Sequence, residues 1–532
     1  MASLTADAVV IGAGPNGLVA ACALADAGWD VVVLEAEDDV GGAVRSAQVV
    51  PGYVHDLFSS FYPLSAASPV LDRLDLGAHG LTWRRSPAVI AHLARPGDEP
   101  DAVLHPDPLD TAAGLQAEHR GDGDTWLRLV DHWNRLRDPL LAALFTPIPP
   151  ARPLAALLAR MPPSQALWTA RLALMPVHAL GEELFGGQGG RLLLAGNAAH
   201  SDVPTVGALS GAFGWLLAML AQDVGFPVPE GGAGRLAQAL ASRATSAGAQ
   251  LRTGARVERV VTRSGRALGV VAADGTAVRA RRAVLATCAA PVLYRHLLAA
   301  DDVPPGMRAA LDRFGSDLPT VKVNWALREP VPWRAEGARA AGTVHVGAGT
   351  DELADWSTSL ATGRPSPHVF ALVGQPAVAD RSRAPGGGEA LWAYTHLPRG
   401  ATAADAEALA ERVEDLLEAH APGLRDLVVG RFVQRPGDLE AADGALVGGT
   451  LNGGTAQVHQ QLVFRPVPGT GRPETPVERL YLAGMGAHPG GGVHGSPGWQ
   501  AAQAALHGAR LGGLPGRALT TAQRLLQRPA PW

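Results

Sequence analysis

The chain has 532 residues, of which 47% are hydrophobic and 18% charged, and its formal net charge is −5. One compact core seldom grows to this length, so we expect two domains or more. The basic residues are scattered and are not interleaved with aromatic ones, which argues against a nucleic-acid partner. Cys22 and Cys288 lie in apolar segments without metal-ligand or disulfide spacing, so we expect both to be buried and the protein to be cytoplasmic.

The first elements in chain order are an apolar strand at 8–11, a glycine-rich turn at 12–17, a helix, and a second strand at 30–34 that ends before Glu35. In such a unit the glycines allow a tight turn and a close approach of the backbone to a pyrophosphate. The N–H groups at the start of the helix face the phosphates, and the acid after the second strand accepts hydrogen bonds from a ribose. The pattern predicts a dinucleotide site that includes Gly12, Gly14, Asn16, Gly17 and Glu35.

A later stretch, 203–222, contains no charge and has the minimum length of a membrane span. It also contains Pro204 and three glycines, and no lysine or arginine flanks it. We expect a buried helix that lines an apolar cavity, with a membrane-dipping element as the alternative. Peripheral contact with a membrane therefore stays open, and no signal peptide is expected at the amino terminus.

The residues after Glu35, "AEDDVGGAVRS", resemble the paired-glycine extension of the FAD-dependent amine oxidase and phytoene desaturase superfamily. The resemblance implies that Gly41, Gly42 and Arg45 contact the phosphates of non-covalently bound FAD. The segment 51–60 is similar to the one that passes the flavin ring in that family, with Asp56 as its aspartate.

Two internal segments resemble the same family. The segment 225–241 is similar to its entry into a helix, and "VFRPVPG" at 463–469 is similar to the segment before its last strand. Residues 251–287 are expected to form strands joined by hairpins at Ser264-Gly265 and Asp274-Gly275. In the family this segment returns to the FAD domain, which implies that the Val257 backbone meets the adenine.

The carboxy-terminal motif begins with a strand expected at 480–483, continues with a glycine-dense loop, and ends with a helix from about Ser496 to Gly512. It is similar to the motif that ends the phytoene desaturases and implies cofactor contacts at Gly484, Gly492 and Val493. Amine oxidases usually carry an acid where this chain has Met485, which favours the desaturase branch.

The resemblance implies an α/β protein with a discontinuous Rossmann-type FAD-binding domain and an inserted mixed α+β substrate domain. We assign residues 1–75, 225–300 and 478–532 to the FAD-binding domain. The substrate-binding domain then takes 76–224, as a helical lobe, and 301–477, as a mixed sheet. No second strand–GxGxxG–helix unit follows, so dioxygen, a quinone or a carrier is the expected electron acceptor rather than NAD(P)H.

Lys322, the chain's one lysine, is the first catalytic candidate. It lies in an expected half-buried strand at 318–327, on the face that looks toward a cavity. A desolvated lysine has a lowered pKa and holds a water or takes a proton, and relatives place a lysine near flavin N5. The alternative is a lysine that only reaches solvent at a strand edge.

Three histidines complete the candidates. His488 and His494 flank the glycine-dense loop, where one of them contacts the flavin or both only fill the loop with hydrogen bonds. His200 stands before the apolar stretch and either lines the substrate cavity or caps a helix.

The resemblance predicts an FAD-dependent oxidoreductase that dehydrogenates, or desaturates, a largely apolar small molecule by hydride transfer to flavin N5. A flavin amine oxidase would instead need an aromatic cage and release hydrogen peroxide. A redox-neutral flavin-dependent isomerase would need reduced flavin and no acceptor. A non-catalytic prenyl-protein carrier of the Rab escort type shares the fold but has lost the FAD fingerprint that this chain keeps.

Overall fold

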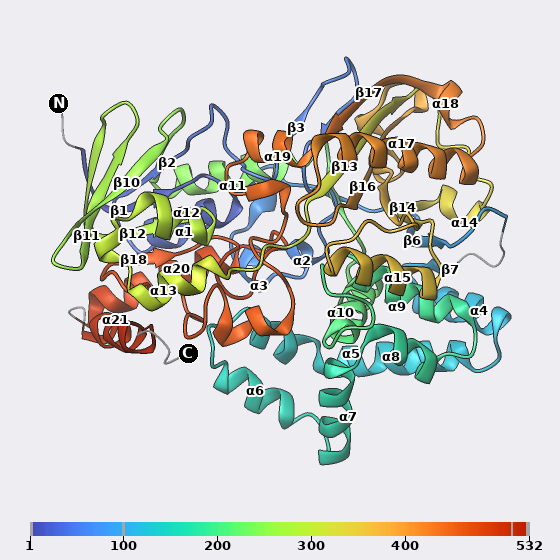
Figure 1. Ribbon diagram of the computed structural model, residues 1–532, viewed down its shortest axis with the longest axis horizontal. Helices are drawn as coiled ribbons and strands as arrows, with labels where there is room; N and C mark the ends of the chain where they lie inside the picture. Colours follow the sequence, from blue (N-terminus) through green and yellow to red (C-terminus); the bar gives the residue numbers. More distant parts are fainter. Residues whose placement is uncertain (1–3, 98–101, 512–513, 528–532) are drawn as a thin grey trace.

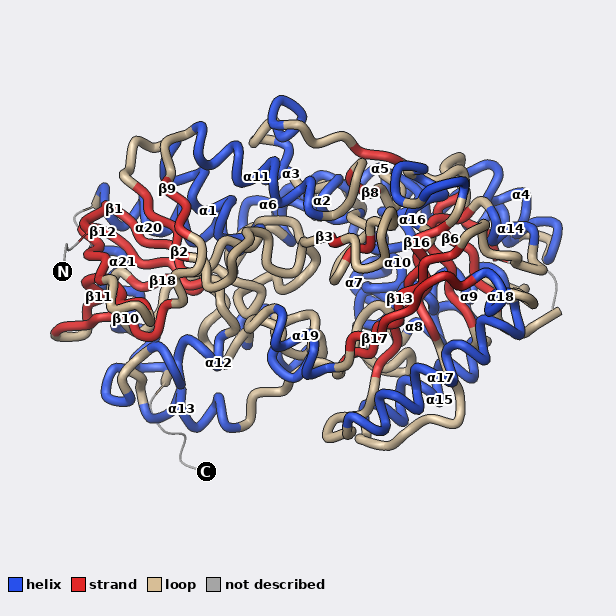
Figure 2. Tube along the Cα trace, turned by 90° about the horizontal axis from the view of Figure 1, so that it is seen from above, coloured by secondary structure: helices blue, strands red, loops and turns tan. Residues whose placement is uncertain are grey.

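The computed structural model describes residues 4–97, 102–511 and 514–527. Two seven-stranded sheets stand at opposite ends of the molecule, and loops fill the space between them (Figures 1 and 2). A group of helices lies beneath the second sheet in Figure 1. This arrangement agrees with the predicted α/β class.

The first sheet has the order β10-β11-β12-β1-β2-β9, and β18 pairs with β12. Strand β1 runs parallel to β2 and β12, and its apolar residues from Ala6 onward are buried, as in a sheet covered on both faces. Its strands are β1 (Leu4–Ile11), β2 (Val31–Leu34), β9 (Gln250–Arg252), β10 (Val257–Arg263), β11 (Arg266–Ala272), β12 (Ala277–Ala286) and β18 (Leu480–Leu482).

The two predicted hairpins are present in this sheet. Ser264 and Gly265 join β10 to β11, and both have positive φ angles of 52° and 71°, as a two-residue hairpin turn requires. Gly275, with φ of 80°, lies in the turn between β11 and β12. The hairpins bring Val257, the first residue of β10, to the end of the sheet near Glu35.

Helices pack on this sheet through small residues. The core beside α1 is rich in alanine, so α1 approaches both α11 and α20 closely. The helices of this part are α1 (Pro15–Asp26), α2 (Pro63–Ala66), α3 (Pro69–Asp72), α11 (Gly234–Ser246), α12 (Ala290–Val292), α13 (Pro305–Asp312), α20 (Ser496–Arg510) and α21 (Leu514–Leu526).

The second sheet has the order β17-β13-β16-β15-β14-β6-β7. Its strands are β6 (Ala88–Leu93), β7 (Ala102–Leu104), β13 (Thr320–Leu327), β14 (Ala341–Val346), β15 (Ala371–Gly374), β16 (Glu389–His396) and β17 (Val428–Gln434). The expectation that this sheet comes only from 301–477 is wrong, because β6 pairs in parallel with β14 and brings β7 with it.

Strand β13 is an inner strand, and every residue from Thr320 to Leu327 is buried, whereas a half-buried strand was expected. Val321, Val323 and Trp325 pack in a core that also holds residues of α17. Lys322 points to the other face. The helices of this part are α14 (Glu336–Arg339), α15 (Thr350–Ala361), α16 (Pro376–Ala379), α17 (Ala403–His420), α18 (Leu424–Leu427) and α19 (Pro436–Ala442).

The helical lobe packs against the β6 side of the second sheet and shares a core with it. Its helices are α4 (Pro108–Glu118), α5 (Asp122–Leu144), α6 (Ala151–Leu158), α7 (Pro163–Leu174), α8 (Val177–Leu184), α9 (Gln188–Ala198) and α10 (Ser210–Asp223). The uncharged stretch 203–222 is helical only from Ser210 onward, where α10 begins. None of the described helices combines the length and the hydropathy needed to cross a membrane.

Two short antiparallel pairs connect the parts: β3 (Ser46–Ala47) with β4 (His55–Asp56), and β5 (Trp83–Arg84) with β8 (Val228–Pro229).

Candidate functional site

A long cleft runs from the carboxyl ends of β1 and β2 to the glycine-dense loop before α20. Its walls come from segments far apart in the sequence, and residues 442–445 and Leu451 close it from the side of the second sheet. Its lining is Ile11, Gly12, Gly14–Asn16, Leu34–Glu37, Gly42–Arg45, Arg256, Val257, Thr287, Cys288, Val292, Leu297, Ala442–Ala445, Leu451, Met485 and Gly490–His494.

The glycines at the start of α1 leave no room for a side chain. Gly12 has φ of 96°, and a Cβ on Gly12 would overlap Thr287 Oγ1. A Cβ on Gly17 would overlap the carbonyl oxygen of Gly12. Helix α1 begins after Gly14 without a side-chain cap, so its first N–H groups are left for an anion in the cleft.

Glu35 stands at one end of the cleft and is only 8% exposed. Its Oε2 accepts a hydrogen bond from the Ala13 N–H at 2.6 Å, and its Oε1 accepts one from Glu37 at 3.0 Å. These bonds hold the carboxylate beside the turn, next to Val257. The arrangement fits the ribose and adenine of a dinucleotide.

The glycine-dense loop forms the other end of the cleft. Gly490 and Gly492 have φ angles of 115° and 117°, and Val493 has φ of 53°, so the backbone turns sharply against the cleft. A Cβ on Gly484 would overlap the carbonyl oxygen of Thr287, which explains a glycine behind the wall.

His494 lines this end of the cleft, and both of its ring nitrogens are engaged. Nδ1 accepts from the Ser496 N–H at 3.1 Å, so Nε2 carries the proton and donates to the Gly491 carbonyl at 3.2 Å. Burial lowers the pKa of His494 to about 4, which keeps the ring neutral. These contacts fill the loop with hydrogen bonds, while the ring also lines the cleft, so both of the roles considered for His494 stay open.

Helix α20 begins at Ser496, as expected, but the Ser496 side chain does not cap it. Gly495 is the N-cap and Ser496 is the first helical residue. Ser496 Oγ donates instead to the Phe145 carbonyl at 3.1 Å, and Gln500 Nε2 donates to the same oxygen at 3.0 Å. The Phe145 ring lies 4.9 Å from the ring of His494, so the end of α5 is fastened to the wall of the cleft.

His488 is buried behind this loop and does not line the cleft. Burial lowers its pKa to about 4, while hydrogen bonding to the Thr146 backbone acts in the opposite direction. Its Nε2 has no partner among the described residues.

Lys322 also stands outside the lining. Its Nζ donates to the carbonyl oxygens of Asp56 and, at 3.0 Å, of Phe58, and it lies 5.3 Å from the centre of the Trp392 ring. Burial lowers the pKa of this amine to about 7. The lysine is therefore enclosed by the protein, and the alternative of a lysine that reaches solvent at a strand edge does not apply.

Asp56 is fully buried and does not line the cleft, so a direct cofactor contact by this side chain has no support in the structure. It forms a buried ion pair with Arg383. It also accepts from Ser46 Oγ at 2.7 Å, from Ser60 Oγ at 2.5 Å and from the Ala233 N–H at 2.8 Å. The Arg383 guanidinium and these hydrogen bonds lower the pKa of Asp56 against the opposing effect of burial.

His200 lies after α9 rather than at the start of the apolar helix, and it does not line the cleft. Its Nε2 lies 3.0 Å from His345 Nε2, and His345 stacks edge-on against His92. The Nδ1 atoms of His92 and His345 both approach Gly196 and have no partner among the described residues. Burial keeps all three rings neutral by lowering their pKa values.

The structure reveals a buried polar group that the sequence did not single out. Asp202 Oδ1 accepts from the Ala456 N–H at 2.7 Å, and Asp317 Oδ2 accepts from the Leu451 N–H at 2.7 Å. Arg465 Nη2 donates to the Met485 carbonyl at 2.8 Å. Together these side chains fix residues 451–456 against the glycine-dense loop. Only Arg465 lies in a motif that resembles the family, "VFRPVPG". The sequence around Asp202 and Asp317 contains no motif that would have predicted their role.

Comparisons with known proteins place this geometry in a family. The model of the family described as flavin containing amine oxidoreductase matches residues 16–506. The chain belongs to this family. It is therefore an oxidoreductase that uses FAD.

Individual relatives align with different shares of this flavoprotein. It is 30% identical to the rat (Rattus norvegicus) "pyridine nucleotide-disulfide oxidoreductase domain-containing protein 2", over 93% of this chain and 92% of the relative. It is 28% identical to a "phytoene desaturase (lycopene-forming)" of Pseudescherichia vulneris, over 53% of this chain and 56% of the relative. The crystal structure of an oxidoreductase from Methanosarcina mazei has the same fold, with a TM-score of 0.61, 15% identity, and 95% and 100% of the two chains covered.

The cleft fits FAD. Of the residues predicted to contact the cofactor, Gly12, Gly14, Asn16, Glu35, Gly42, Arg45, Val257, Gly492 and Val493 line the cleft. Gly17, Gly41 and Gly484 stand behind its wall, where side chains would push neighbouring segments apart. Glu35 and Val257 would hold the adenosine, the α1 turn the pyrophosphate, and the 490–494 loop the flavin. When bound, FAD supplies the hydride acceptor that no side chain offers.

Arg45 has a role that the sequence did not predict. Its guanidinium donates to the Gly42 carbonyl at 3.0 Å and to the Ala442 carbonyl, and it lies 5.2 Å from the centre of the Phe58 ring. It therefore joins the paired-glycine turn to residues 442–445 of the other wall. Asp443 lies in this wall, and burial raises the pKa of its carboxyl.

Proposed function

We propose that the flavoprotein dehydrogenates a largely apolar small molecule, with hydride transfer from a C–H bond of the substrate to flavin N5. The observation that carries the proposal is the flavin end of the cleft. Leu451, Met485 and Val493 line it together with glycines, and the ring of His494 is engaged at both nitrogens. Such a wall offers apolar contact and no charged anchor, which suits a substrate without charge.

Relatives support the same direction. Besides the phytoene desaturase, a "hydroxyneurosporene desaturase" of Cereibacter sphaeroides is 31% identical over 52% of this chain and 54% of its own length. Both names describe desaturation of polyene substrates. Met485 agrees with this branch, because its thioether packs beside Gly453 and brings no charge to the flavin.

Lys322 takes a positioning role in this proposal. The carbonyl groups of Asp56 and Phe58 point toward its amine, while the N–H groups of the alternate residues, Leu57 and Ser59, bond to the carbonyls of Arg45 and Ala43 in the cleft wall. The lysine thus positions segment 56–59, and this segment in turn holds the cleft wall at Ala43 and Arg45. The proton lost by the substrate goes to solvent or to the flavin, and the electrons leave to dioxygen, a quinone or a carrier.

Anaerobic mixing of the purified yellow protein with candidate substrates tests the proposal. Apolar polyenes are expected to bleach the flavin absorbance, and short amines are not. Quinone or dioxygen is then added to identify the acceptor that restores the colour. Bleaching by amines with release of hydrogen peroxide on aeration would establish an amine oxidase instead. Product formation that requires reduced flavin and consumes no acceptor would establish an isomerase.

A further inference from the structure

The two helices α6 and α7 leave an unusual number of apolar side chains in solvent. Figure 1 shows them at the lower edge of the molecule, below the rest of the helical lobe. Helix α6 buries none of its residues, and α7 buries only Leu172. Leu158 on α6 is 51% exposed and Leu167 on α7 is 74% exposed. Leu154 and Leu174 are exposed on the same two helices.

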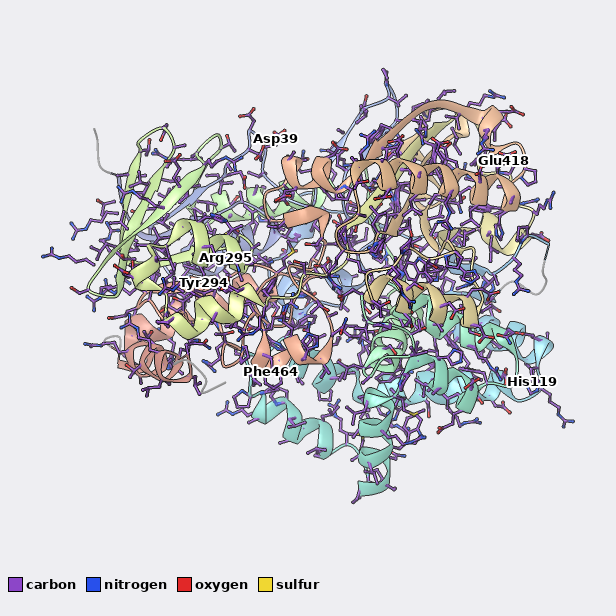
Figure 3. All side chains as sticks on the ribbon, in the orientation of Figure 1. Asp39, His119, Tyr294, Arg295, Glu418 and Phe464 are labelled. Carbon is purple, nitrogen blue, oxygen red and sulfur yellow. The ribbon has the colours of Figure 1, made fainter. Side chains whose placement is uncertain are left out.

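A second segment extends this apolar surface. Val458, Leu462, Val463 and Phe464 are all exposed, and Figure 3 labels Phe464 near α6. The Ile148 N–H, just before α6, donates to the Gly471 carbonyl at 3.4 Å. Gly471 in turn packs on the backbone of Leu462 and Val463. The two exposed segments therefore adjoin.

The charge of this surface has one sign. Residues 139–181 contain three arginines and no aspartate or glutamate. Residues 444–473 contain no acid either, but their two arginines add no free charge, because Arg465 is buried and Arg472 pairs with Glu474. Arg171 pairs with Glu183, which follows the first segment. Arg152 and Arg160 form no ion pair within the part of the chain that the structure describes, so their charges are available.

From these observations we propose that α6, α7 and residues 458–464 dock on an anionic lipid surface. Exposed leucines would enter the boundary between headgroups and acyl chains, while Arg152 and Arg160 would meet the phosphates. Both segments lack carboxylates, which favours an anionic partner. A protein partner that carries both charges would be expected to face a surface with both charges as well. A monomeric protein seldom leaves such an apolar patch without a partner.

The chain segment that leads into the docking surface contacts the wall of the cofactor cleft. Helix α6 follows the end of α5, where Phe145 packs on His494 and its carbonyl bonds to Ser496 and Gln500. On the proposed function, this places the flavin end of the cleft close to the lipid from which an apolar substrate is drawn. The docking itself does not depend on the identity of that substrate.

Flotation of the FAD-loaded protein with vesicles tests the proposal. Vesicles of phosphatidylglycerol and phosphatidylcholine are compared with vesicles of phosphatidylcholine alone. The wild-type protein is expected to float with the anionic vesicles, and added salt is expected to reduce its binding. Each of Leu154→Ser, Leu158→Ser and Leu167→Ser is expected to lower the partition coefficient about tenfold. Arg152→Gln and Arg160→Gln are expected to lower it about fivefold each.

Two matched variants serve as controls. Leu109→Ser removes a leucine from α4 whose exposure lies within the range of the tested leucines, and Arg308→Gln removes an exposed arginine from α13 that forms no ion pair among the described residues. Neither is expected to change flotation, and every variant keeps its flavin absorbance because no changed residue lines the cleft.

Three outcomes would overturn the proposal. They are a wild-type protein that does not float, leucine variants that float as well as the wild type, and a wild-type dimer that the leucine changes dissociate without any vesicle binding. The last would identify the surface as a contact between two copies. Anaerobic bleaching by substrate in solution is scored separately, so failure of docking leaves the proposed reaction intact.

Discussion

Lys322 Nζ lies 3.0 Å from the carbonyl oxygen of Phe58 in the protein interior. Residues 56–59 separate the amine from the wall of the cofactor cleft. The other partner of the amine is the carbonyl of Asp56, whose carboxylate forms the buried pair with Arg383. The single lysine of the chain is therefore part of the support behind the wall formed by Ala43 and Arg45.

Replacement of Lys322 by methionine is expected to leave FAD bound but to slow flavin reduction. The change leaves two buried carbonyl groups without a donor, at a cost of about 1–3 kcal/mol each. Stopped-flow reduction and the flavin content measure the two effects. Unchanged reduction would remove Lys322 from the reaction and leave it a purely structural residue.

The same variant tests the state of the amine. Burial lowers the pKa of Lys322 to about 7 from 10.5, so between these values the unfolded chain binds a proton that the folded protein does not. The free energy of unfolding of the wild type should therefore rise with pH across this window relative to Lys322→Met. Urea unfolding of both proteins at several pH values gives the difference. A difference that is constant with pH would show that the lysine keeps its ordinary pKa.

Replacement of Asp56 by asparagine is expected to destabilise the protein by about 3–5 kcal/mol, because it leaves the Arg383 guanidinium buried without its partner. Asp26→Asn is the matched control. Asp26 pairs with Arg243 at 2.7 Å on the surface, and its loss is expected to cost no more than about 1 kcal/mol. Chemical denaturation measures both. Equal effects would mean that the buried pair contributes no more than a surface pair.

Gly12 belongs to a pattern of neighbouring residues that the sequence predicts, whereas the long-range contacts of Asp56 cannot be predicted from the sequence. The turn at 12–17, the hairpins and the glycine-dense loop depend on neighbours in the chain, so local patterns predict them. Two of the partners of Asp56, Ala233 and Arg383, lie 177 and 327 positions away. Phe58 lies 264 positions from Lys322. No local pattern encodes such contacts, and for the same reason β6 was not expected in the second sheet. The positions of Asp202 and Asp317 beside residues 451–456 also depend on the assembled fold.

Replacement of Gly17 by alanine tests the fit of the α1 turn. A Cβ at this position overlaps the Gly12 carbonyl oxygen, so helix and turn must separate. We expect a loss of about 1–3 kcal/mol in stability and a marked loss of bound FAD. Gly114→Ala in α4 is the control. No atom lies within 4 Å of its added Cβ, and the change is expected to stabilise that helix by about 0.5–1 kcal/mol. Flavin content per chain and thermal unfolding distinguish the two, and a fully loaded Gly17→Ala protein would contradict the tight turn.

Acid is expected to weaken the flavin end of the cleft, because protonation opposes the buried, neutral state of His494. Its pKa is lowered from 6.5 to about 4, so its contribution to stability is complete above 6.5 and is lost as the pH falls toward 4. Within that window one such histidine changes the unfolding free energy by about 1.4 kcal/mol per pH unit. His488 has the same shift and adds to the slope.

Two substitutions at His494 separate its proton from its hydrogen bond. In His494→Asn the amide oxygen takes the place of Nδ1 and still accepts from the Ser496 N–H, whereas His494→Leu has no acceptor at the start of α20. In both variants the unfolding free energy is expected to depend less on pH below 6.5, by the contribution of one titrating proton, because neither asparagine nor leucine titrates there. Only the leucine variant leaves the buried Ser496 N–H without an acceptor, which is expected to cost about 1–3 kcal/mol at neutral pH. Unfolding followed by flavin fluorescence across this pH range measures both terms. An undiminished slope in the asparagine variant would show that other groups carry the acid response.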